Sequence, residues 1–202
     1  MRDARCRHPV SRIAYRVSRI MKVFRNPADA LLESDSVLTI GVFDGVHRAH
    51  RALMHETVRR AHAAHRLAGA VTFDPHPVEV LAPQSPLRYL TTLDERIERI
   101  AALGLDFLYV LPFTLETSRT LAEDFVRPLF DQLRMRDLVV GFDFALGYKR
   151  QGNVEFLRAL GERWGFSLFT LDALKSGGQV ISSTRIRTLI ATGRIAAAAH
   201  LL

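Results

Sequence analysis

Two histidines, His47 and His50, lie three residues apart where an apolar run gives way to a helical pattern. Residues at i and i+3 share one side of a helix, and free N–H groups and the helix dipole at a helix entrance favour an anion. Two imidazoles at this place suit phosphate oxygens, above all oxygens that gain negative charge during a reaction. The spacing alone also fits a fragment of a metal site or ordinary polar residues at a helix start.

The glycine turn before these histidines narrows the kind of site. Gly45 would let the chain approach a ligand closely. Neither a Walker A sequence nor a G-x-G-x-x-G fingerprint occurs in the chain, which excludes a P-loop and the usual dinucleotide turn.

A second polar stretch, residues 181–187 with the sequence ISSTRIR, could also bind phosphate. Three hydroxyl residues precede two arginines at the expected start of a helix: Ser182, Ser183, Thr184, Arg185 and Arg187. Hydroxyls, free N–H groups and a guanidinium together can hold a polyphosphate. The alternative is a helix capped by a hydroxyl, with its arginines in solvent.

The elements that would position these residues alternate along the chain. Short β-rich runs occur at 36–43, 68–73, 107–111, 137–142, 166–171 and 179–182, and helical patterns occur at 48–66, 93–102, 120–133, 153–164 and 184–191. This alternation predicts an α/β fold, a Rossmann-like parallel sheet with helices on both faces. Thr120 and Glu123 predict a capping box for the third helix, Gly104 and Gly165 predict helix ends, and Pro128 predicts a kink.

Polar residues gather where the predicted strands end. The segments that follow the first four strands are FDGVH, FDPHP, PF and FDF. Ligands of parallel sheets bind beyond the carboxyl ends of the strands, so these four loops predict one shared site.

Composition and charge exclude several classes of protein. The 202 residues suffice for one domain, and no apolar run of about 18 residues predicts a membrane span. The single cysteine, Cys6, excludes an internal disulfide and favours a reducing, cytoplasmic setting. Residues 1–25 hold eight basic residues against Asp3, whereas the remainder carries 20 basic and 20 acidic residues. The net charge of +7 therefore belongs to the N-terminus, which argues against a nucleic-acid partner.

Residues 1–20 form a basic N-terminal extension that we expect to lie outside the fold. Val10, Ile13, Val17 and Ile20 are spaced as on one helix face, with arginines between them. The segment fits a presequence or a membrane-surface helix, or a start upstream of the true one at Met21. The predicted domain is therefore residues 21–202.

Five segments in order carry a resemblance to a known family. GVFDGVHRAH resembles the HxGH signature of the nucleotidylyltransferase superfamily, and ISSTRIR resembles its ISSTxxR signature. With MKVFR, TFDPHP (72–77) and VVGFDFALGYKRQGN (139–153), the chain from Met21 onward resembles the FMN adenylyltransferase module of bacterial bifunctional riboflavin kinase/FAD synthetases. The resemblance implies the nucleotidylyltransferase fold and transfer of AMP from ATP to FMN, giving FAD and pyrophosphate.

The same resemblance implies roles for residues at matching positions. Catalysis would fall to His47, His50 and Arg187. ATP would be bound by Gly41, Phe43, Asp44, Gly45, Ser183 and Thr184, and the flavin by Asp74, Pro75, His76, Asp143 and Phe144. Mg²⁺ would be held mainly by the phosphates, with no protein ligand assigned. Asp44 could instead cap the turn, and Asp143 could be a structural partner.

Three departures from the family pattern leave alternatives open. Ala49 replaces the HxGH glycine, and Leu146 replaces an aromatic residue expected on the flavin side. The chain also stops about where a riboflavin kinase module would begin, so kinase activity is expected from a missing domain or another protein. The alternatives are another HxGH-type nucleotidylyltransferase and a flavin- or nucleotide-binding protein without catalysis.

Overall fold

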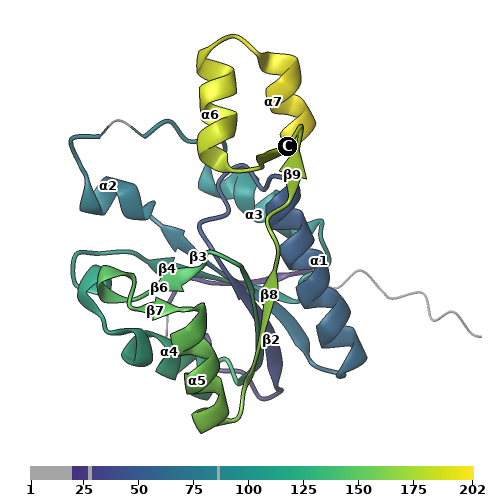
Figure 1. Ribbon diagram of the computed structural model, residues 1–202. Helices are drawn as coiled ribbons and strands as arrows, with labels where there is room; N and C mark the ends of the chain where they lie inside the picture. Colours follow the sequence, from purple (N-terminus) through teal and green to yellow (C-terminus); the bar gives the residue numbers. More distant parts are fainter. Residues whose placement is uncertain (1–19, 27–28, 86) are drawn as a thin grey trace, which may run out of the picture.

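A parallel β-sheet of six strands forms the centre of the molecule, seen in a computed structural model that describes residues 20–26, 29–85 and 87–202 (Figure 1). The strands are β1 (Lys22–Phe24), β2 (Ser36–Ile40), β3 (Leu67–Asp74), β4 (Phe107–Pro112), β5 (Met135–Gly141) and β8 (Ser167–Leu171). They lie in the order β1-β4-β3-β2-β5-β8, and every pair is parallel. The predicted α/β fold is confirmed, and β1 adds an edge strand that the sequence pattern did not predict.

Helices cover both faces of this sheet. All five predicted helices are present, with ends shifted by a few residues: α1 (Arg48–Ala63), α3 (Leu93–Ala101), α4 (Ala122–Asp131), α5 (Val154–Trp164) and α6 (Ser183–Ala191). Strand residues alternate between the two faces, as the pleat requires. Leu38 packs in the core cluster that includes α4 and α5, whereas Val37 packs in the cluster that includes α1 and α3. No helix of the described ranges is long and apolar enough to cross a membrane.

The remaining elements lie outside the main sheet. Two short helices, α2 (Pro77–Leu81) and α7 (Ile195–Leu201), were not predicted. The strand predicted at 179–182 is only β10 (Gln179–Val180), which pairs with β9 (Lys175–Ser176) in an antiparallel hairpin. A second small hairpin joins β6 (Ala145–Leu146) to β7 (Gly152–Asn153). Helices α6 and α7 pack together on their own apolar cluster beyond one end of the sheet, at the top of the view in Figure 1.

The capping box predicted at Thr120 and Glu123 is wrong. The N-cap of α4 is Leu121, without a side-chain cap, because the Thr120 hydroxyl donates to the Glu116 carbonyl and the Glu123 carboxylate pairs with Arg163. A capping box does occur at α3, where Thr92 and Glu95 exchange hydrogen bonds of 3.2 and 2.8 Å.

The other predictions about helix ends and kinks are confirmed in part. Gly165 ends α5 in the left-handed conformation (φ 84°), as predicted, and Gly104 lies three residues beyond α3 with a φ of 81°. Pro128 lies inside α4, and the helix continues to Asp131. A proline costs one intrahelical hydrogen bond, and here the amphipathic packing of α4 on the core outweighs that loss.

The strand order places a topological switch point at β2. From β2 the chain passes through α1 to β3 on one side, and it later returns to β5 on the other side. Connections that leave a strand in opposite directions open a crevice at the carboxyl ends of the strands. The turn after β2 and the loop after β5 border this crevice.

Candidate active site

A cavity of about 290 Å³ opens at the switch point. Its walls come from the turn after β2, the first turn of α1, the loops after β5 and β8, and the start of α6. The predicted site residues that line it include His47, His50, Asp143, Phe144 and Ser183. The structure therefore brings two sequence-distant phosphate-binding candidates, the histidine pair and the start of α6, to one cavity.

His47 and His50 form a stacked pair at the entrance of α1. His47 is the N-cap residue, and its Nδ1 accepts the backbone N–H of His50 at 3.4 Å. The two rings stack with centroids 3.5 Å apart, and the Phe43 ring meets the His50 ring edge-on at 5.2 Å. Nδ1 of His50 is buried and has no hydrogen-bond partner among the described residues. The pair is thus held in place by ring packing and by the N-cap hydrogen bond.

Burial keeps both imidazoles neutral. Desolvation lowers the pKa of His47 from 6.5 to about 4, although its backbone hydrogen bond and the Asp44 charge partly oppose this. Desolvation, with smaller contributions from His47 and Arg96, holds the pKa of His50 well below its usual range. A neutral imidazole presents one N–H donor and one acceptor. At neutral pH the pair can therefore donate hydrogen bonds to phosphate oxygens, while the helix entrance supplies the positive potential.

The turn between β2 and α1 is backbone-strained. Phe43 and Val46 adopt left-handed conformations, with φ values of 55° and 42°, which are uncommon for such side chains and cluster at functional sites. A Cβ on Gly41 would meet the Phe43 ring at 2.7 Å. Gly45 has a φ of 82°, and a Cβ there would meet Cδ1 of Leu90 at 2.8 Å. Gly45 thus allows the turn and leaves room for the Leu90 side chain. The close approach expected at this glycine is therefore to a protein side chain and not to a ligand.

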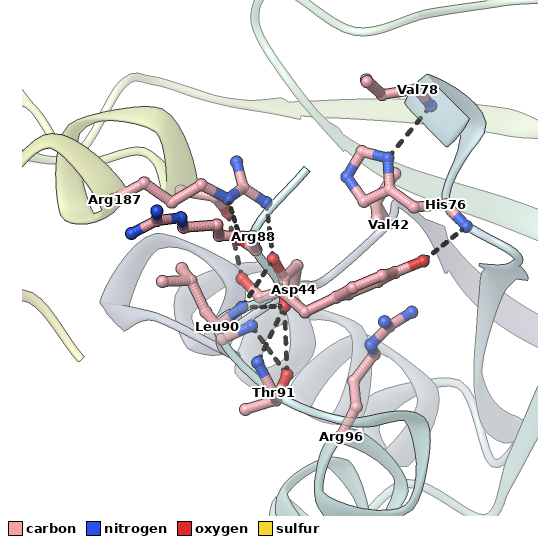
Figure 2. Close-up of polar contacts among 12 residues, drawn as sticks. Val42, Asp44, His76, Val78, Arg88, Leu90, Thr91, Arg96 and Arg187 are labelled. Carbon is pink, nitrogen blue, oxygen red and sulfur yellow. Dashed lines mark hydrogen bonds and ion pairs between the residues drawn. The ribbon is translucent and has the colours of Figure 1, made fainter. Parts of the chain in front are cut away.

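Asp44 ties this turn to distant segments. The carboxylate is 1% exposed and accepts hydrogen bonds from the backbone N–H groups of Leu90 and Thr91, each at 3.0 Å (Figure 2). It also forms an ion pair with Arg187 of α6. Asp44 is therefore an internal anchor for the turn, in line with the structural alternative left open by the sequence.

The start of α6 presents hydroxyls to the cavity, but its arginine is engaged elsewhere. Ser182 is the N-cap residue, and Ser183 Oγ donates to the Asp44 carbonyl at 3.0 Å. Both serines line the cavity, whereas Thr184 is exposed and does not line it. Besides its pair with Asp44, Arg187 donates through Nε to the Arg88 carbonyl at 2.8 Å (Figure 2). Arg187 is not among the cavity-lining residues.

The residues assigned to the flavin fall into two groups. Asp143 and Phe144 line the cavity beside the histidines, but Asp74, Pro75 and His76 do not. These three follow the end of β3, where the Asp74–Pro75 peptide is cis. His76 caps α2 through Nδ1, its backbone N–H donates to the Tyr89 hydroxyl at 3.0 Å, and burial lowers its pKa (Figure 2).

The two departures from the family pattern are accommodated without distortion. Ala49 lies in the first turn of α1, outside the positive-φ residues, and packs against the apolar cluster of α6 and α7. Leu146 is 8% exposed and belongs to the core cluster rather than to the cavity lining. Neither side chain forces the backbone away from the site.

Arg96 is the residue that the sequence reasoning missed. It lies on α3 with 0% exposure, and its charge influences the pKa of both His50 and His76. A signal was available, because Arg96 falls at i+3 in the apolar stripe of Leu93, Ile97 and Ile100. No cluster of three or more His, Cys, Asp or Glu side chains suited to a metal ion occurs in the described part of the chain.

The parallel sheet and its switch-point site define an α/β nucleotidylyltransferase-like fold. Two solved structures share this architecture. A crystal structure named as a macrolide-efflux protein from Streptococcus pneumoniae has a TM-score of 0.79 and 25% identity, covering 90% of this chain and 59% of that one. Pantoate-beta-alanine ligase from Francisella tularensis, complexed with beta-gamma ATP and beta-alanine, has a TM-score of 0.56 and 15% identity, covering 88% of this chain and 77% of that one, and shows the fold alone.

The sequence comparisons identify the family. Residues 30–185 match the family model for FAD synthetase, and the chain belongs to this family. Proteins named bifunctional riboflavin kinase/FMN adenylyltransferase are 34% identical in Escherichia coli K12 (82% of this chain, 53% of the relative) and 33% identical in Listeria monocytogenes (86% and 55%). A putative one from Geobacillus thermodenitrificans is 37% identical, covering 78% and 84%. The chain thus spans about half the length of the first two relatives.

Proposed function

We propose that this chain transfers the adenylyl group of ATP to the phosphate of FMN, giving FAD and pyrophosphate. The observation that carries the proposal is the shared cavity at the switch point, where a stacked histidine pair faces the start of α6. Membership of the FAD synthetase family supports the identity of both substrates. The names of the relatives include FMN adenylyltransferase, which is the same reaction.

The chemistry needs positioning more than it needs proton transfer. An oxygen of the FMN phosphate would attack the α-phosphorus of ATP and form the new P–O–P bond. The bond from the α-phosphorus to the bridging oxygen would break, and pyrophosphate would leave with that electron pair. Because the FMN phosphate is already ionised, no general base is required, and holding two polyanions in line is the main barrier.

The residues of the cavity suit these tasks. His47 and His50 would donate N–H groups to phosphate oxygens as charge builds on them. The first turn of α6, with Ser183, would bind the β- and γ-phosphates through hydroxyl and backbone N–H groups. Asp143 and Phe144 would border the flavin from the loop after β5, and the turn from Asp74 to His76 from the end of β3. Arg187 would act on the phosphates only after releasing part of its contact with Asp44.

Mg²⁺ fits this site as a phosphate-bound ion. Mg²⁺ keeps waters and takes one or two carboxylates together with substrate phosphates, so it needs no cluster of protein ligands. Bound in this way, the ion would neutralise charge on the phosphates. Asp143 and Asp172 are the cavity-lining carboxylates that could contact it.

Incubation with FMN, ATP and Mg²⁺ tests the proposal, with chromatography for FAD and an assay for pyrophosphate. We expect equal amounts of both products, and none when riboflavin replaces FMN. Tight FMN binding without pyrophosphate release would identify a binding protein without catalysis. Transfer to another mononucleotide or phosphate ester in a substrate panel, without FAD, would identify a different nucleotidylyltransferase. Riboflavin kinase activity from a missing domain or another protein, and the cytoplasmic setting, stay predictions.

A further inference from the structure

A buried arginine lies beneath the junction of the two groups of site residues. Arg96 is 0% exposed, although it comes from α3, a helix whose other charged residues face solvent. Its Nη1 donates to the Phe73 carbonyl at 3.2 Å and to Thr72 Oγ1 at 3.4 Å. Its Nε and Nη2 have no hydrogen-bond partner among the described residues, and it forms no ion pair with any of them.

The contacts of Arg96 connect the two sides of the site. Phe73 directly precedes the turn of Asp74, Pro75 and His76. Thr72 Oγ1 in turn donates to the Val42 carbonyl at 2.8 Å, at the start of the strained turn after β2. One guanidinium nitrogen thus holds the end of β3, which is itself bonded to the turn that carries the histidines. Figure 2 shows Arg96 extending from its helix in the direction of His76.

The charge of Arg96 is fixed and has no carboxylate in direct contact among the described residues. A guanidinium stays protonated in proteins, and burying it without a carboxylate in contact is costly. Asp44, Tyr89 and Asp74 act on it through space, and desolvation lowers its pKa. Violations of this kind are expected where a protein trades stability for function. A buried positive charge would serve a neighbouring site that must bring two polyanions together.

We propose that Arg96 is a positioning residue for the adenylyl transfer, which holds the end of β3 against the turn after β2 and sets a fixed positive charge beneath the place where two anionic substrates meet. The inference rests on the function proposed above. A preorganised charge acts most strongly as negative charge develops in the transition state. A displacement of reacting groups by about 1 Å can cost on the order of 10²-fold in rate.

Two variants of Arg96 separate the contribution of its charge from that of its planar hydrogen-bonding geometry, and a variant of another arginine is the matched control. Arg96→Met removes the charge and the donors, and Arg96→Lys keeps the charge but loses the planar fork. Arg66→Met is the control, because Arg66 is a half-buried arginine at the opposite end of β3, paired with Asp137. In steady-state FAD synthesis we expect Arg96→Met to lower kcat about 100-fold, with smaller changes in both KM values. Arg96→Lys should recover about tenfold of that loss, and Arg66→Met should match the wild type.

Histidine titration by NMR provides a readout that does not depend on activity. In Arg96→Met the pKa values of His50 and His76 should rise, whereas that of His47, which Arg96 does not perturb, should stay in place. A folded Arg96→Met with wild-type kcat and unchanged titrations would overturn the inference. If that variant does not fold, a folded Arg96→Gln, which also removes the charge, with wild-type kcat and unchanged titrations overturns it. Failure of the wild-type protein to make FAD would overturn the proposed function instead, and the titrations would still test Arg96.

Discussion

The polar side chains at the two ends of the central sheet differ in whether they have partners. At the amino end, arginines lie against carboxylates: Arg66 pairs with Asp137 at 2.9 Å, and Arg134 pairs with Asp35 at 3.0 Å. At the carboxyl end, His50 Nδ1 and two nitrogens of Arg96 are buried without partners among the described residues. The strands therefore begin beside ion pairs, whereas their carboxyl ends combine the Asp44–Arg187 pair with buried polar groups that remain available.

This difference indicates which end of the sheet holds the functional site. Buried polar groups without partners lower the stability of the fold. Strained backbone lowers it further, as at Phe43 and Val46 after β2. Both costs occur at the switch point, where a ligand of an α/β sheet is expected, although His65 and Arg134 at the amino end also have positive φ values. We expect the amino end to contribute to stability alone, and the carboxyl end to contribute to anion binding as well. Substitutions at the amino end should accordingly change stability without changing turnover, whereas substitutions at the carboxyl end should change turnover, stability or both.

The largest expected effect is on turnover. His47→Ala or His50→Ala should lower kcat for FAD synthesis by about 10²–10³, comparable with the loss of an oxyanion donor. His55→Ala is the matched control, because His55 is an exposed histidine on the same helix. Steady-state kinetics with FMN and ATP check this. Near-wild-type rates for both site variants would remove the role assigned to the pair.

The next largest expected effect is on stability, at Asp44, which anchors the turn after β2. Asp44→Asn keeps the shape of the side chain but breaks its ion pair with Arg187, so we expect a loss of about 3 kcal/mol in the free energy of unfolding, as for a buried pair that loses one partner. Urea unfolding followed by circular dichroism measures this loss. A change below about 1 kcal/mol would mean that the pair contributes no more than a surface ion pair.

Stability should also depend on pH through the buried histidines. The unfolded chain binds a proton at His47 below about pH 6.5, whereas the folded chain does so only near pH 4. The free energy of unfolding should therefore fall as pH is lowered from 6.5 toward 4, by up to about 1.4 kcal/mol per pH unit for each such histidine. Urea midpoints between these pH values should show a shallower slope in His47→Gln than in the wild type. Equal slopes in the two proteins would contradict the burial argument.

The smallest effect belongs to the amino end. Asp137→Asn should lower the free energy of unfolding by about 1 kcal/mol, since its partner Arg66 is partly exposed. FAD synthesis per folded molecule should not change. A loss of kcat as large as that of the histidine variants would erase the distinction between the two ends of the sheet.

Local patterns predicted the parts of this molecule that depend on local periodicity. The alternation of apolar runs and helical patterns gave the parallel sheet and all five main helices, because burial on two faces leaves this signature. The histidine pair and the hydroxyls at 182–183 were found as site candidates, and they share one cavity.

Features that depend on distant contacts could not be predicted in this way. The partner of Asp44 lies 143 positions away, at Arg187. Thr120 and Glu123 have the spacing of a capping box, but Glu123 pairs with Arg163 on another helix. Arg96 was passed over because a charged helix residue is usually solvated, although its place in the apolar stripe indicated burial. Strand β1, with three residues, is too short to show a period.

The most direct test of the central claim follows the phosphorus itself. ATP radiolabelled at its α-phosphate would be incubated with FMN, Mg²⁺ and the protein, and FAD would be isolated by chromatography. We predict that the label enters FAD in proportion to the pyrophosphate released, and that label from the γ-phosphate does not. Unlabelled flavin from folded protein that binds FMN and ATP would contradict adenylyl transfer at this site.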